Sequence, residues 1–305
     1  MGKALYDELP EVRPLFEAAS DAAGLDVIKL MFKGPLPALS ETAVLQPAIT
    51  AVNLACLHYL RQGRRLRPAA TAGHSLGEYS ALACAGVVEP EAAVRLTAER
   101  GRLMTRAAAA RPGEMYAVIG LDADEVVAEV EGLIPRERGG VANLNAPNQV
   151  VISGEPGAMK QVVAALKRKR TRAVKLNVSG AWHSELMETI DEEFAAVLDS
   201  VEFSPPTIKL FLNVAGEAVE DPEEIRSCLK RQLRNRVRWI EIQQGLQALG
   251  VTRFVEVGPG RVLRGLLRRT LPDPKAYEAH CAGDLRALEQ VAELLGSTQV
   301  SSVKA

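Results

Sequence analysis

The chain has 305 residues and a mass of 32.8 kDa, with 37 basic residues against 38 acidic ones and a formal net charge of −1. Apolar residues make up 47% and charged residues 25% of the composition, which is typical of a globular protein and excludes a disordered or fibrous chain. Such a balanced charge gives no overall field that would capture a polyanion, so we do not expect nucleic acid as a partner.

The length favours one large domain, or a large domain that carries a smaller insert. The longest apolar stretches are interrupted before the length of a transmembrane helix, and residues 1–7 contain no apolar signal segment. We therefore expect a cytoplasmic monomer without a membrane partner. The cysteines Cys56, Cys84, Cys228 and Cys281 form no C-x-x-C pair, which predicts reduced and mostly buried thiols.

The first predicted elements lead to a sharp turn at residue 75. Apolar residues recur at helical spacing over 10–30, and residues 46–60 are predicted to form a buried helix with Pro47 in its first turn. A short unbroken run of small residues, 68–73, predicts a strand, and another helix is predicted directly afterwards over 76–85.

Between residues 113 and 178 the pattern predicts a separate small unit. Its strands and helices alternate in the order βαββαβ, which is the order of a ferredoxin-like unit. The ends of such a unit lie close together, so it can be inserted into a host domain. The predicted elements are a strand at 115–121, a helix from Asp122, strands at 140–146 and 148–154, a helix at 156–170 and a strand at 172–178.

The rest of the chain adds further α/β elements: a helix over 187–198, a strand over 253–257 and a helix over 261–269. The abundant alanine and the 4% of aromatic residues favour helices packed closely on a sheet. We therefore predict an α/β fold with an α/β-hydrolase-like large domain, built on a parallel central sheet from residues 1–112 and 179–305, and a ferredoxin-like small subdomain at 113–178.

Gly73-His74-Ser75-Leu76-Gly77 fits G-x-S-x-G and stands between a predicted strand and a predicted helix. A serine on such a turn has an exposed hydroxyl, and the flanking glycines remove Cβ atoms that would clash. The helix N-terminus and the backbone N–H of Leu76 would face a developing oxyanion. The alternative is a glycine-rich turn in which Ser75 only caps the following helix.

A serine nucleophile needs a base, and the chain has four histidines. His58 lies in a predicted apolar helix, His280 lies in a C-terminal connection, and the side chain of His74 is expected to point away around the turn. His183 remains, at the exit of the small subdomain. The residues alone leave its role open, because a lone histidine is more often structural than catalytic.

Six ordered blocks spread over nearly the whole chain make the sequence similar to the malonyl-CoA:acyl carrier protein transacylase family, the acyltransferases of bacterial fatty-acid synthesis. The blocks are Gly73–Ala81, Glu99–Met104, Asn143–Pro147 with the following VVISG, Val178–His183, Gln232 with Val237–Trp239, and Glu256–Gly260.

This resemblance implies a catalytic dyad in which Ser75 is acylated and His183 acts as general base and acid. It implies that the backbone carbonyl of Gln232 orients His183, and that the Leu76 N–H serves the oxyanion. The substrates implied are malonyl-CoA and the phosphopantetheine thiol of acyl carrier protein, with no metal and no other cofactor.

The resemblance also implies that Arg100 binds the free carboxylate of the malonyl group through two parallel N–H bonds. The alternative is that Arg100 is one of several exposed cations on its helix. Trp182 stands where the family places a bulky aromatic residue, which implies exclusion of branched acyl groups. We count His74 and Asn143, which lie in the matching blocks, among the candidate substrate-binding residues.

The resemblance has one gap, at the start of the chain. Family members open with a hydrophobic strand and a Gly-Gln-Gly-Ser-Gln turn, whose glutamine contributes to the oxyanion hole, and the 305 residues contain neither. Without that strand we expect an unpaired backbone edge in the parallel sheet, or neighbouring strands forced together. We favour a late start codon or a truncated chain, and a real loss predicts a weakened enzyme or a carrier-binding relative.

Three alternative functions stay open at this point. A related acyltransferase of polyketide assembly or malonate decarboxylation would share every block and differ in its carrier. A carrier-binding protein without turnover would form no acyl-serine. A general α/β serine hydrolase would hydrolyse esters independently of Arg100.

Overall fold

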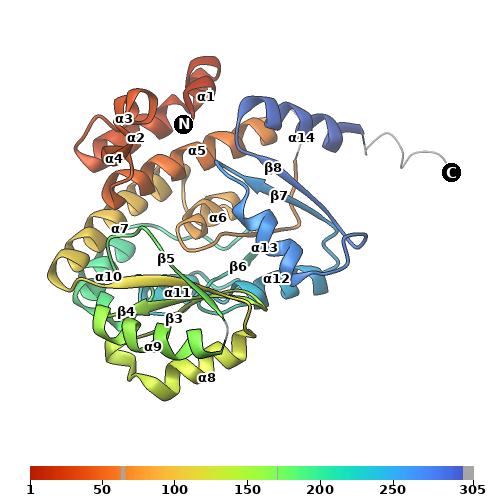
Figure 1. Cartoon of the computed structure of the whole chain (residues 1–305). Helices are drawn as coiled ribbons and strands as arrows, with labels where there is room; N and C mark the ends of the chain where they lie inside the picture. The colour runs from red at the N-terminus through yellow and green to blue at the C-terminus, as the bar shows by residue number, and fades with distance from the viewer. Residues whose placement is uncertain (63–65, 170, 298–305) are drawn as a thin grey trace.

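The computed structural model describes residues 1–62, 66–169 and 171–297, which form a large α/β body and a smaller antiparallel sheet with two helices (Figure 1). The large body contains two parallel strand pairs surrounded by helices. Its helices are α1 (Lys3–Glu8), α2 (Arg13–Ala23), α3 (Val27–Lys33), α4 (Leu36–Leu39), α5 (Thr42–Gln62), α6 (Gly77–Ala85), α7 (Pro90–Ala110), α10 (Asp191–Asp199), α11 (Pro222–Gln232), α12 (Trp239–Ala248), α13 (Val262–Thr270) and α14 (Leu285–Ser297).

Two predictions about the N-terminal helices were wrong in detail. The helical pattern of 10–30 is broken after α2 by Gly24, which ends the helix with φ 62° in the left-handed region that glycine tolerates. Helix α5 begins at Thr42, so Pro47 lies inside the helix and not in its first turn. Gln46, the first residue of the predicted helix, thus lies inside α5, where it is 6% exposed.

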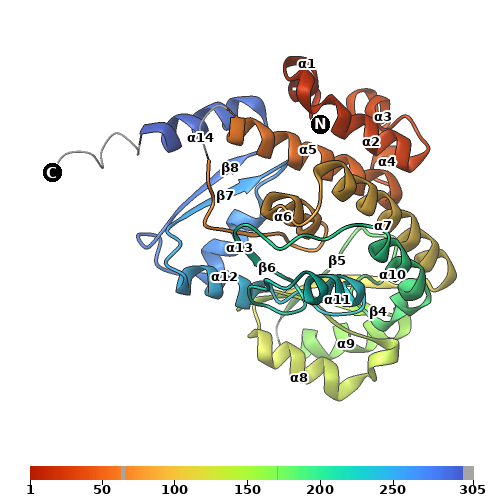
Figure 2. The ribbon, with the colours of Figure 1, turned by 180° about the vertical axis from the view of Figure 1, so that it is seen from behind.

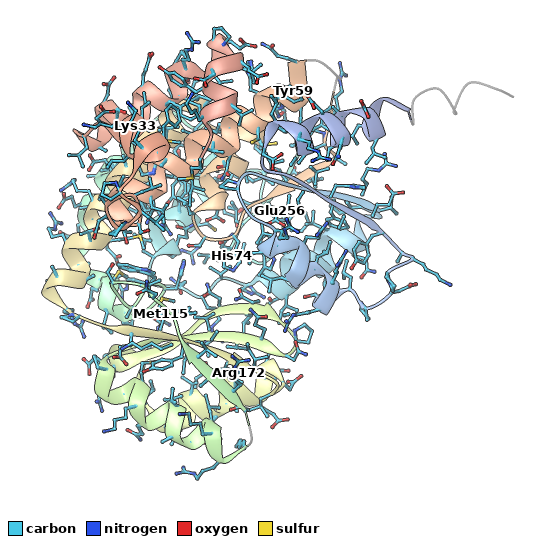
Figure 3. The ribbon with its side chains drawn as sticks, turned by 45° about the horizontal axis from the view of Figure 1, so that its top comes forward. Lys33, Tyr59, His74, Met115, Arg172 and Glu256 are labelled. Carbon is cyan, nitrogen blue, oxygen red and sulfur yellow. The ribbon has the colours of Figure 1, made fainter. Side chains whose placement is uncertain are left out.

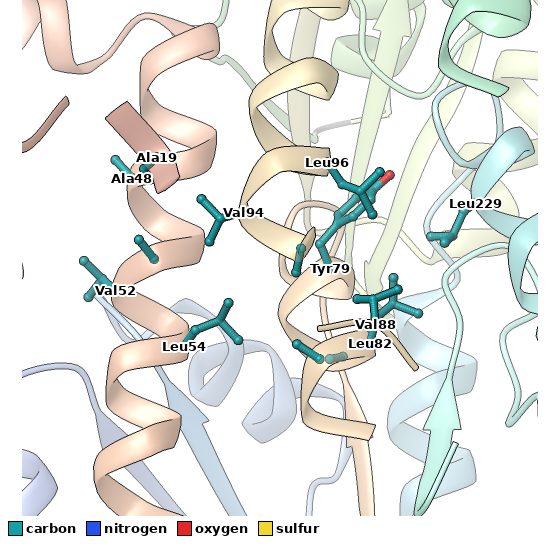
Figure 4. Packing of buried hydrophobic residues seen from close by; sticks show 14 of the residues in the cluster. Ala19, Ala48, Val52, Leu54, Tyr79, Leu82, Val88, Val94, Leu96 and Leu229 are labelled. Carbon is teal, nitrogen blue, oxygen red and sulfur yellow. The ribbon is translucent and has the colours of Figure 1, made fainter. Parts of the chain in front are cut away.

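The core of the large body lies between α5, α7 and α6. Small side chains on α5, such as Ala48 and Ala51, let these helices approach closely. Figure 4 shows Leu54 of α5 on the side of Val94 of α7 and of Tyr79 and Leu82 of α6, while Ala48 lies beside Ala19 of α2. By length and composition α5 could cross a membrane, but 72% of its apolar window is buried within this core, as in the central helix of a globular fold.

The parallel strands form two separate pairs. Strand β1 (Ala70–Ala72) pairs with β6 (Lys209–Phe211), and β7 (Arg253–Val257) pairs with β8 (Glu278–Ala282). Parallel strands between helices confirm the predicted fold class. Within the described part of the chain no strand pairs with the second edge of β1 or of β7, so the structure shows the unpaired edges expected for the missing strand.

The small sheet contains β2 (Glu114–Ile119), β3 (Gly139–Ala146), β4 (Gln149–Gly154) and β5 (Arg172–Lys175) in the antiparallel order β3-β4-β2-β5. This is the ferredoxin-like order, as predicted. Helices α8 (Ala123–Leu133) and α9 (Pro156–Arg168) cover its outer face (Figure 2). Residue 170, the last of the predicted second helix, lies outside the described residues.

Both faces of the small sheet are buried, which explains the unbroken apolar run of β4. Val150 and Ile152 pack against α8 and α9, whereas Val151 between them belongs to the core of the large body. The side chain of Asp122 accepts from the N–H of Asp124 and caps α8 as predicted. The sheet is therefore packed firmly on the body that carries the turn at Ser75.

The helix predicted over 187–198 is two elements. A 3₁₀ helix covers Glu185–Ile190 and α10 follows over Asp191–Asp199. Two further 3₁₀ turns lie at Pro10–Val12 and Arg136–Arg138. The strand predicted at 253–257 and the helix predicted at 261–269 are confirmed as β7 and α13. All four cysteines are free, and three of them are buried.

Candidate active site

Ser75 stands on a tight turn between β1 and α6. Its φ is 49°, a left-handed conformation that costs energy for a residue with a side chain. The turn is possible because residue 73 is glycine: a Cβ there would lie 2.0 Å from the carbonyl carbon of Gly77. The expectation for the second glycine was wrong, since a Cβ at Gly77 would meet no atom within 4 Å.

The Ser75 hydroxyl is partly exposed and bonds to His183. The Oγ atom lies 2.8 Å from Nε2 of His183, and Nδ1 of His183 lies 2.9 Å from the backbone oxygen of Gln232 and 3.1 Å from that of Asn235. A carbonyl only accepts, so Nδ1 carries the proton and Nε2 presents a lone pair to the serine. The imidazole is thus held as a neutral base by backbone carbonyls and not by a carboxylate.

Burial keeps His183 neutral. The side chain is 4% exposed, and desolvation together with the nearby Arg100 charge lowers its pKa from 6.5 to about 3, against the opposing effect of the Gln232 carbonyl. His183 also has a positive φ, 59°. Among the described residues, Ser75 and His183 are the two non-glycine residues with positive φ.

Arg100 reaches the same serine oxygen from α7. Its Nη2 donates to Ser75 Oγ at 3.0 Å, its Nη1 to Oε1 of Gln46 at 2.7 Å, and its Nε to Oε1 of Gln232 at 3.2 Å. The guanidinium also lies over the ring of Tyr79, 5.6 Å from its centre. One cation is thereby fixed beside the Ser75 hydroxyl, held by neutral amide oxygens.

The alternative of an exposed cation on α7 does not hold for Arg100, which is 1% exposed. The other arginines of the helix, Arg95, Arg102 and Arg106, are exposed, and the last two pair with Glu193. The next residue explains the burial: a Cβ at Gly101 would lie 2.7 Å from the backbone oxygen of Thr42, so glycine lets α7 approach α5 closely enough for Arg100 to meet Gln46.

A buried network that the sequence analysis missed holds the turn in place. Glu78 accepts from the backbone N–H of Asn213 and from Nε2 of Gln232. The side chain of Asn213 in turn accepts from the Ser75 N–H at 2.6 Å and donates to the Gly73 oxygen at 2.7 Å, so it holds the turn on both sides of His74. Glu78 lies in the Gly73–Ala81 block and could have been noticed from the sequence. Nothing in the sequence marks Asn213.

Burial raises the pKa of Glu78 to about 7, opposed mainly by the hydrogen bond from Asn213. Gln232 contributes more than its backbone oxygen, because its Nε2 also donates to the backbone oxygen of Ser75 at 3.0 Å. Gln232 thus connects His183, the turn at Ser75 and Arg100.

The side chain of His74 points away from Ser75, as expected. Its Nε2 lies 2.7 Å from Oδ1 of Asn145, and its ring packs edge-on against Trp239. Asn145 is therefore the residue of its block that reaches the turn. Asn143 is 6% exposed on β3, where its backbone forms a bridge to Val237. The substrate-binding roles of His74 and Asn143 stay predictions.

Trp182 precedes His183 and is 9% exposed within the core of the large body. Its ring folds over Gly180, where a Cβ would lie 2.6 Å from the indole, and the same point is 2.8 Å from Ala108. Its role in excluding branched acyl groups stays a prediction.

Leu76 provides the free donor expected at this turn. It precedes the first residue of α6, and no residue in the described ranges accepts from its backbone N–H.

A cavity of about 310 Å³ opens beside His183, between the small sheet and the large body, and is lined by Arg136, Arg234 and Arg236. Within the described residues no cluster of three or more His, Cys, Asp or Glu side chains could hold a metal ion.

Comparison with known proteins shows the family to which the chain belongs. The acyl transferase domain family matches residues 1–302. The malonyl CoA-acyl carrier protein transacylase of Haemophilus influenzae is 38% identical over 288 residues, which cover 94% of this chain and 92% of that protein. The polyketide biosynthesis protein ThaF of Burkholderia thailandensis is 38% identical over 273 residues, 89% of this chain and 23% of that protein.

Solved structures give the same result. The malonyl CoA-acyl carrier protein transacylase of Clostridium perfringens superposes with a TM-score of 0.91 at 31% identity, covering 100% of this chain and 95% of that one. A malonyl-transacylase solved in complex with its type II polyketide acyl carrier protein superposes with a TM-score of 0.88 at 36% identity, covering 96% and 94%. The chain belongs to the acyl transferase domain family, and its relatives in that family include malonyl CoA-acyl carrier protein transacylases.

Proposed function

We propose that this protein transfers a malonyl group from malonyl-CoA to the phosphopantetheine thiol of acyl carrier protein through a malonyl ester on Ser75. One observation carries the proposal: the Ser75 Oγ lies 2.8 Å from a neutral histidine base and 3.0 Å from a buried arginine. A base and a cation that can bind a carboxylate thus flank the nucleophilic oxygen of Ser75.

In the first half-reaction Nε2 of His183 takes the Ser75 proton while Oγ attacks the thioester carbonyl. The oxyanion that forms is stabilised by the free N–H of Leu76 at the start of α6. The C–S bond then breaks, the imidazolium gives its proton to the departing sulfur, and coenzyme A leaves. Backbone carbonyls of Gln232 and Asn235 stabilise the imidazolium while it exists.

In the second half-reaction the thiol of the carrier's phosphopantetheine enters. It loses its proton to His183 as its sulfur attacks the malonyl ester, and the proton returns to the Ser75 oxygen when the ester bond breaks. Each step exchanges one ester or thioester for another without a change of oxidation state. We therefore propose that the reaction needs no metal and no redox cofactor. We also propose that it takes place in the cytoplasm.

Arg100 selects the malonyl group. The malonyl carboxylate is two C–C bonds from the ester carbon, so a guanidinium within hydrogen-bond distance of Oγ can bind it after the serine is acylated. Holding the carboxylate also fixes the acyl group against attack by water. Trp182 is proposed to limit the space for a branched acyl group, and His74 and Asn143 to support the substrate from the adjoining blocks.

The carrier served by this chain could be that of a polyketide pathway, because one similar structure contains a type II polyketide acyl carrier protein. Transfer of radiolabelled malonate from the acyl-enzyme to purified fatty-acid and polyketide carriers separates these two functions. The preferred carrier is the one with the higher kcat/KM.

The decisive test of the proposed function is the mass of the serine peptide. Incubation with malonyl-CoA should add one malonyl group to the peptide that contains Ser75, and Ser75→Ala should abolish the addition. Ser80→Ala is the matched control, because Ser80 is on α6 but its hydroxyl accepts from Nδ2 of Asn53. An unmodified wild-type peptide would contradict the proposal and favour a carrier-binding protein without turnover.

A further inference from the structure

The two carbonyl groups that hold the His183 imidazole lie at the end of helix α11. Nδ1 of His183 lies 2.9 Å from the oxygen of Gln232, the last residue of α11, and 3.1 Å from that of Asn235 in the turn that follows. Carbonyls at the C-terminus of a helix have no partner within the helix and carry the negative end of its dipole, so they can accept from an imidazole and favour its charged form. Their effect depends on what keeps this turn against the segment that carries His183.

Arg234 connects the turn to that segment. It stands between the two residues whose carbonyls accept from His183, and its guanidinium reaches the residues that follow the histidine. Its Nε donates to Oε2 of Glu185 at 2.6 Å, its Nη2 donates to the same oxygen, and its Nη1 donates to Oδ2 of Asp191 at 2.7 Å. The N–H groups of a guanidinium point in fixed directions, so one arginine can set the position of two carboxylates at once.

These contacts are better shielded from solvent than the ion pairs on α7. The side chains of Arg234, Glu185 and Asp191 are 28%, 13% and 26% exposed. In the pair between Arg106 and Glu193 the values are 50% and 42%. Pairs between exposed side chains contribute little and are screened by salt, whereas partly buried pairs are screened less. The contacts of Arg234 are therefore suited to fixing a geometry.

Glu185 is also bound from the side of the small sheet. Its Oε1 lies 2.6 Å from Nε of Arg136, in the turn before β3, and Nη2 of Arg136 donates to the side-chain oxygen of Asn235 at 3.2 Å. Figure 3 shows the labelled His74 beside this junction, between the helices of the large body and the sheet that carries Met115. Two arginines thus connect Glu185 to the turn after α11.

We propose that Arg234 is a positioning residue for the transfer reaction: through its two carboxylate partners it holds the turn after α11 where the carbonyls of that turn fix the His183 imidazole. This inference rests on the proposed function, in which His183 takes the proton of Ser75. An acceptor at Nδ1 selects the tautomer whose Nε2 has a free lone pair, and the other tautomer cannot act as the base. The same carbonyls stabilise the imidazolium that forms in each half-reaction.

The rate of acylation tests the proposal. In Arg234→Ala the turn loses its connection to the histidine segment, so we expect single-turnover acylation of Ser75 to be roughly 10-fold slower at saturating malonyl-CoA. The malonyl-CoA concentration that gives half the maximal rate should change by less than about 2-fold, because Arg234 acts on the base and not on the substrate. The acylated peptide is quantified by mass spectrometry at successive times.

Lys230→Ala is the matched control. Lys230 lies on α11, its side chain is 32% exposed, and its Nζ lies 2.6 Å from Oδ1 of Asp199 on α10. The variant therefore removes an ion pair between α11 and α10 of similar exposure without touching the turn at Asn235. We expect its acylation rate to equal that of wild type.

The ring nitrogens of His183 give a readout that a merely stabilising ion pair would not change. Nitrogen NMR of protein with isotope-labelled histidine reports which ring nitrogen carries the proton, and His183→Asn identifies the signals of this residue. We expect the Nδ1–H tautomer in wild type and in Lys230→Ala, and a mixture of both tautomers in Arg234→Ala.

A second pair of variants keeps the test open if Arg234→Ala does not fold. Arg234→Lys keeps the charge but has no planar fork for two carboxylates, so its acylation rate should lie between those of wild type and Arg234→Ala. Glu185→Gln removes the other side of the contact. The double variant Arg234→Lys with Glu185→Gln should lose less than the product of the two single losses, because both changes break the same contact.

The proposal is wrong if Arg234→Ala acylates Ser75 as fast as wild type does, or if it is slower but keeps the Nδ1–H tautomer. An equal loss in Lys230→Ala, or fully multiplicative losses in the double variant, would likewise assign Arg234 to stability alone. If wild type forms no malonyl-serine, the proposed function fails. The tautomer comparison needs no turnover and still decides whether Arg234 positions His183.

Discussion

Ser75 and His183 both carry backbone strain, since each has a positive φ that a residue with a Cβ adopts at a cost. The surrounding network compensates for this strain: Asn213 holds the Ser75 N–H, and backbone carbonyls of Gln232 and Asn235 hold the imidazole. The serine could be predicted from its motif. The conformation of His183 could not, because it depends on contacts with residues about fifty positions away in sequence.

Arg100→Ala should reduce malonyl transfer more than acetyl transfer. A hydrogen-bonded charge pair contributes about 1.5 to 3 kcal/mol, which corresponds to a loss of roughly 10- to 100-fold for the group that has a carboxylate. An acetyl group has no carboxylate, so its transfer should fall only through disturbance of Gln46 and Gln232. The measurement is kcat/KM with malonyl-CoA and with acetyl-CoA.

Arg102→Ala is the matched control for Arg100, because Arg102 is on the same helix but is exposed and pairs with Glu99 and Glu193. It should leave the ratio of malonyl to acetyl transfer unchanged. Equal losses of both activities in Arg100→Ala would rule out Arg100 as the carboxylate-binding residue.

Trp182→Ser should improve the use of methylmalonyl-CoA relative to malonyl-CoA. The same change removes a buried indole that packs over Gly180 and should cost about 3 to 5 kcal/mol of stability. Selectivity is therefore measured as the ratio of the two kcat/KM values at a temperature where denaturation curves show the variant folded. An unchanged ratio would refute the steric explanation.

Among the elements, those with a strong local signal were predicted well. The residues of β7 match the prediction, and Asp122 caps α8 as its position before the helical pattern indicated. The start of α5 was predicted too late, because the proline preference for a first turn is outweighed by packing of residues 42–46 against α7. The 3₁₀ segment before α10 was missed because its apolar residues are spaced as in an α-helix.

The two glycines of the serine turn should respond differently to alanine. Gly73→Ala places a Cβ about 2 Å from backbone atoms of Gly77, so the turn must open and acylation of Ser75 should be nearly abolished. Gly77→Ala meets no neighbouring atom and lies at the start of α6, where alanine gains up to about 1 kcal/mol over glycine. The measurements are the acylation rate and the free energy of unfolding in urea.

If Gly77→Ala were as damaging as Gly73→Ala, close contact at residue 73 would not explain the motif. If both variants retained activity, the tight geometry of the turn would not be needed to position the Ser75 hydroxyl. The pair therefore tests whether one glycine or both are required by the fold.

At the scale of the whole molecule, the order of strands in the small sheet followed from the alternation of elements along the sequence. The division into residues 1–112 with 179–305 and 113–178 stays a prediction. The buried network around Glu78 could not be predicted, because its hydrogen bonds connect Glu78 to Asn213 and Gln232, 135 and 154 positions away. Such contacts depend on how distant elements pack, and no local pattern encodes them.

Stability of the whole protein should depend on pH through His183. Its pKa is about 3 in the folded protein and 6.5 when exposed, so the unfolded state binds more protons between these values. The contribution of the neutral imidazole to the free energy of unfolding is therefore fully present above pH 6.5 and is lost as the pH falls toward 3. One pH unit below 6.5, the loss is about 1.4 kcal/mol.

The measurement is the difference in unfolding free energy between wild type and His183→Asn from pH 7.5 to pH 5. Asparagine tolerates the left-handed φ of residue 183 and does not titrate, so His74 and Glu78 contribute alike to both proteins. We expect wild type to lose stability relative to the variant as the pH falls. Parallel curves would show that burial does not hold His183 neutral. The assignment of His183 as the general base would then lose this support.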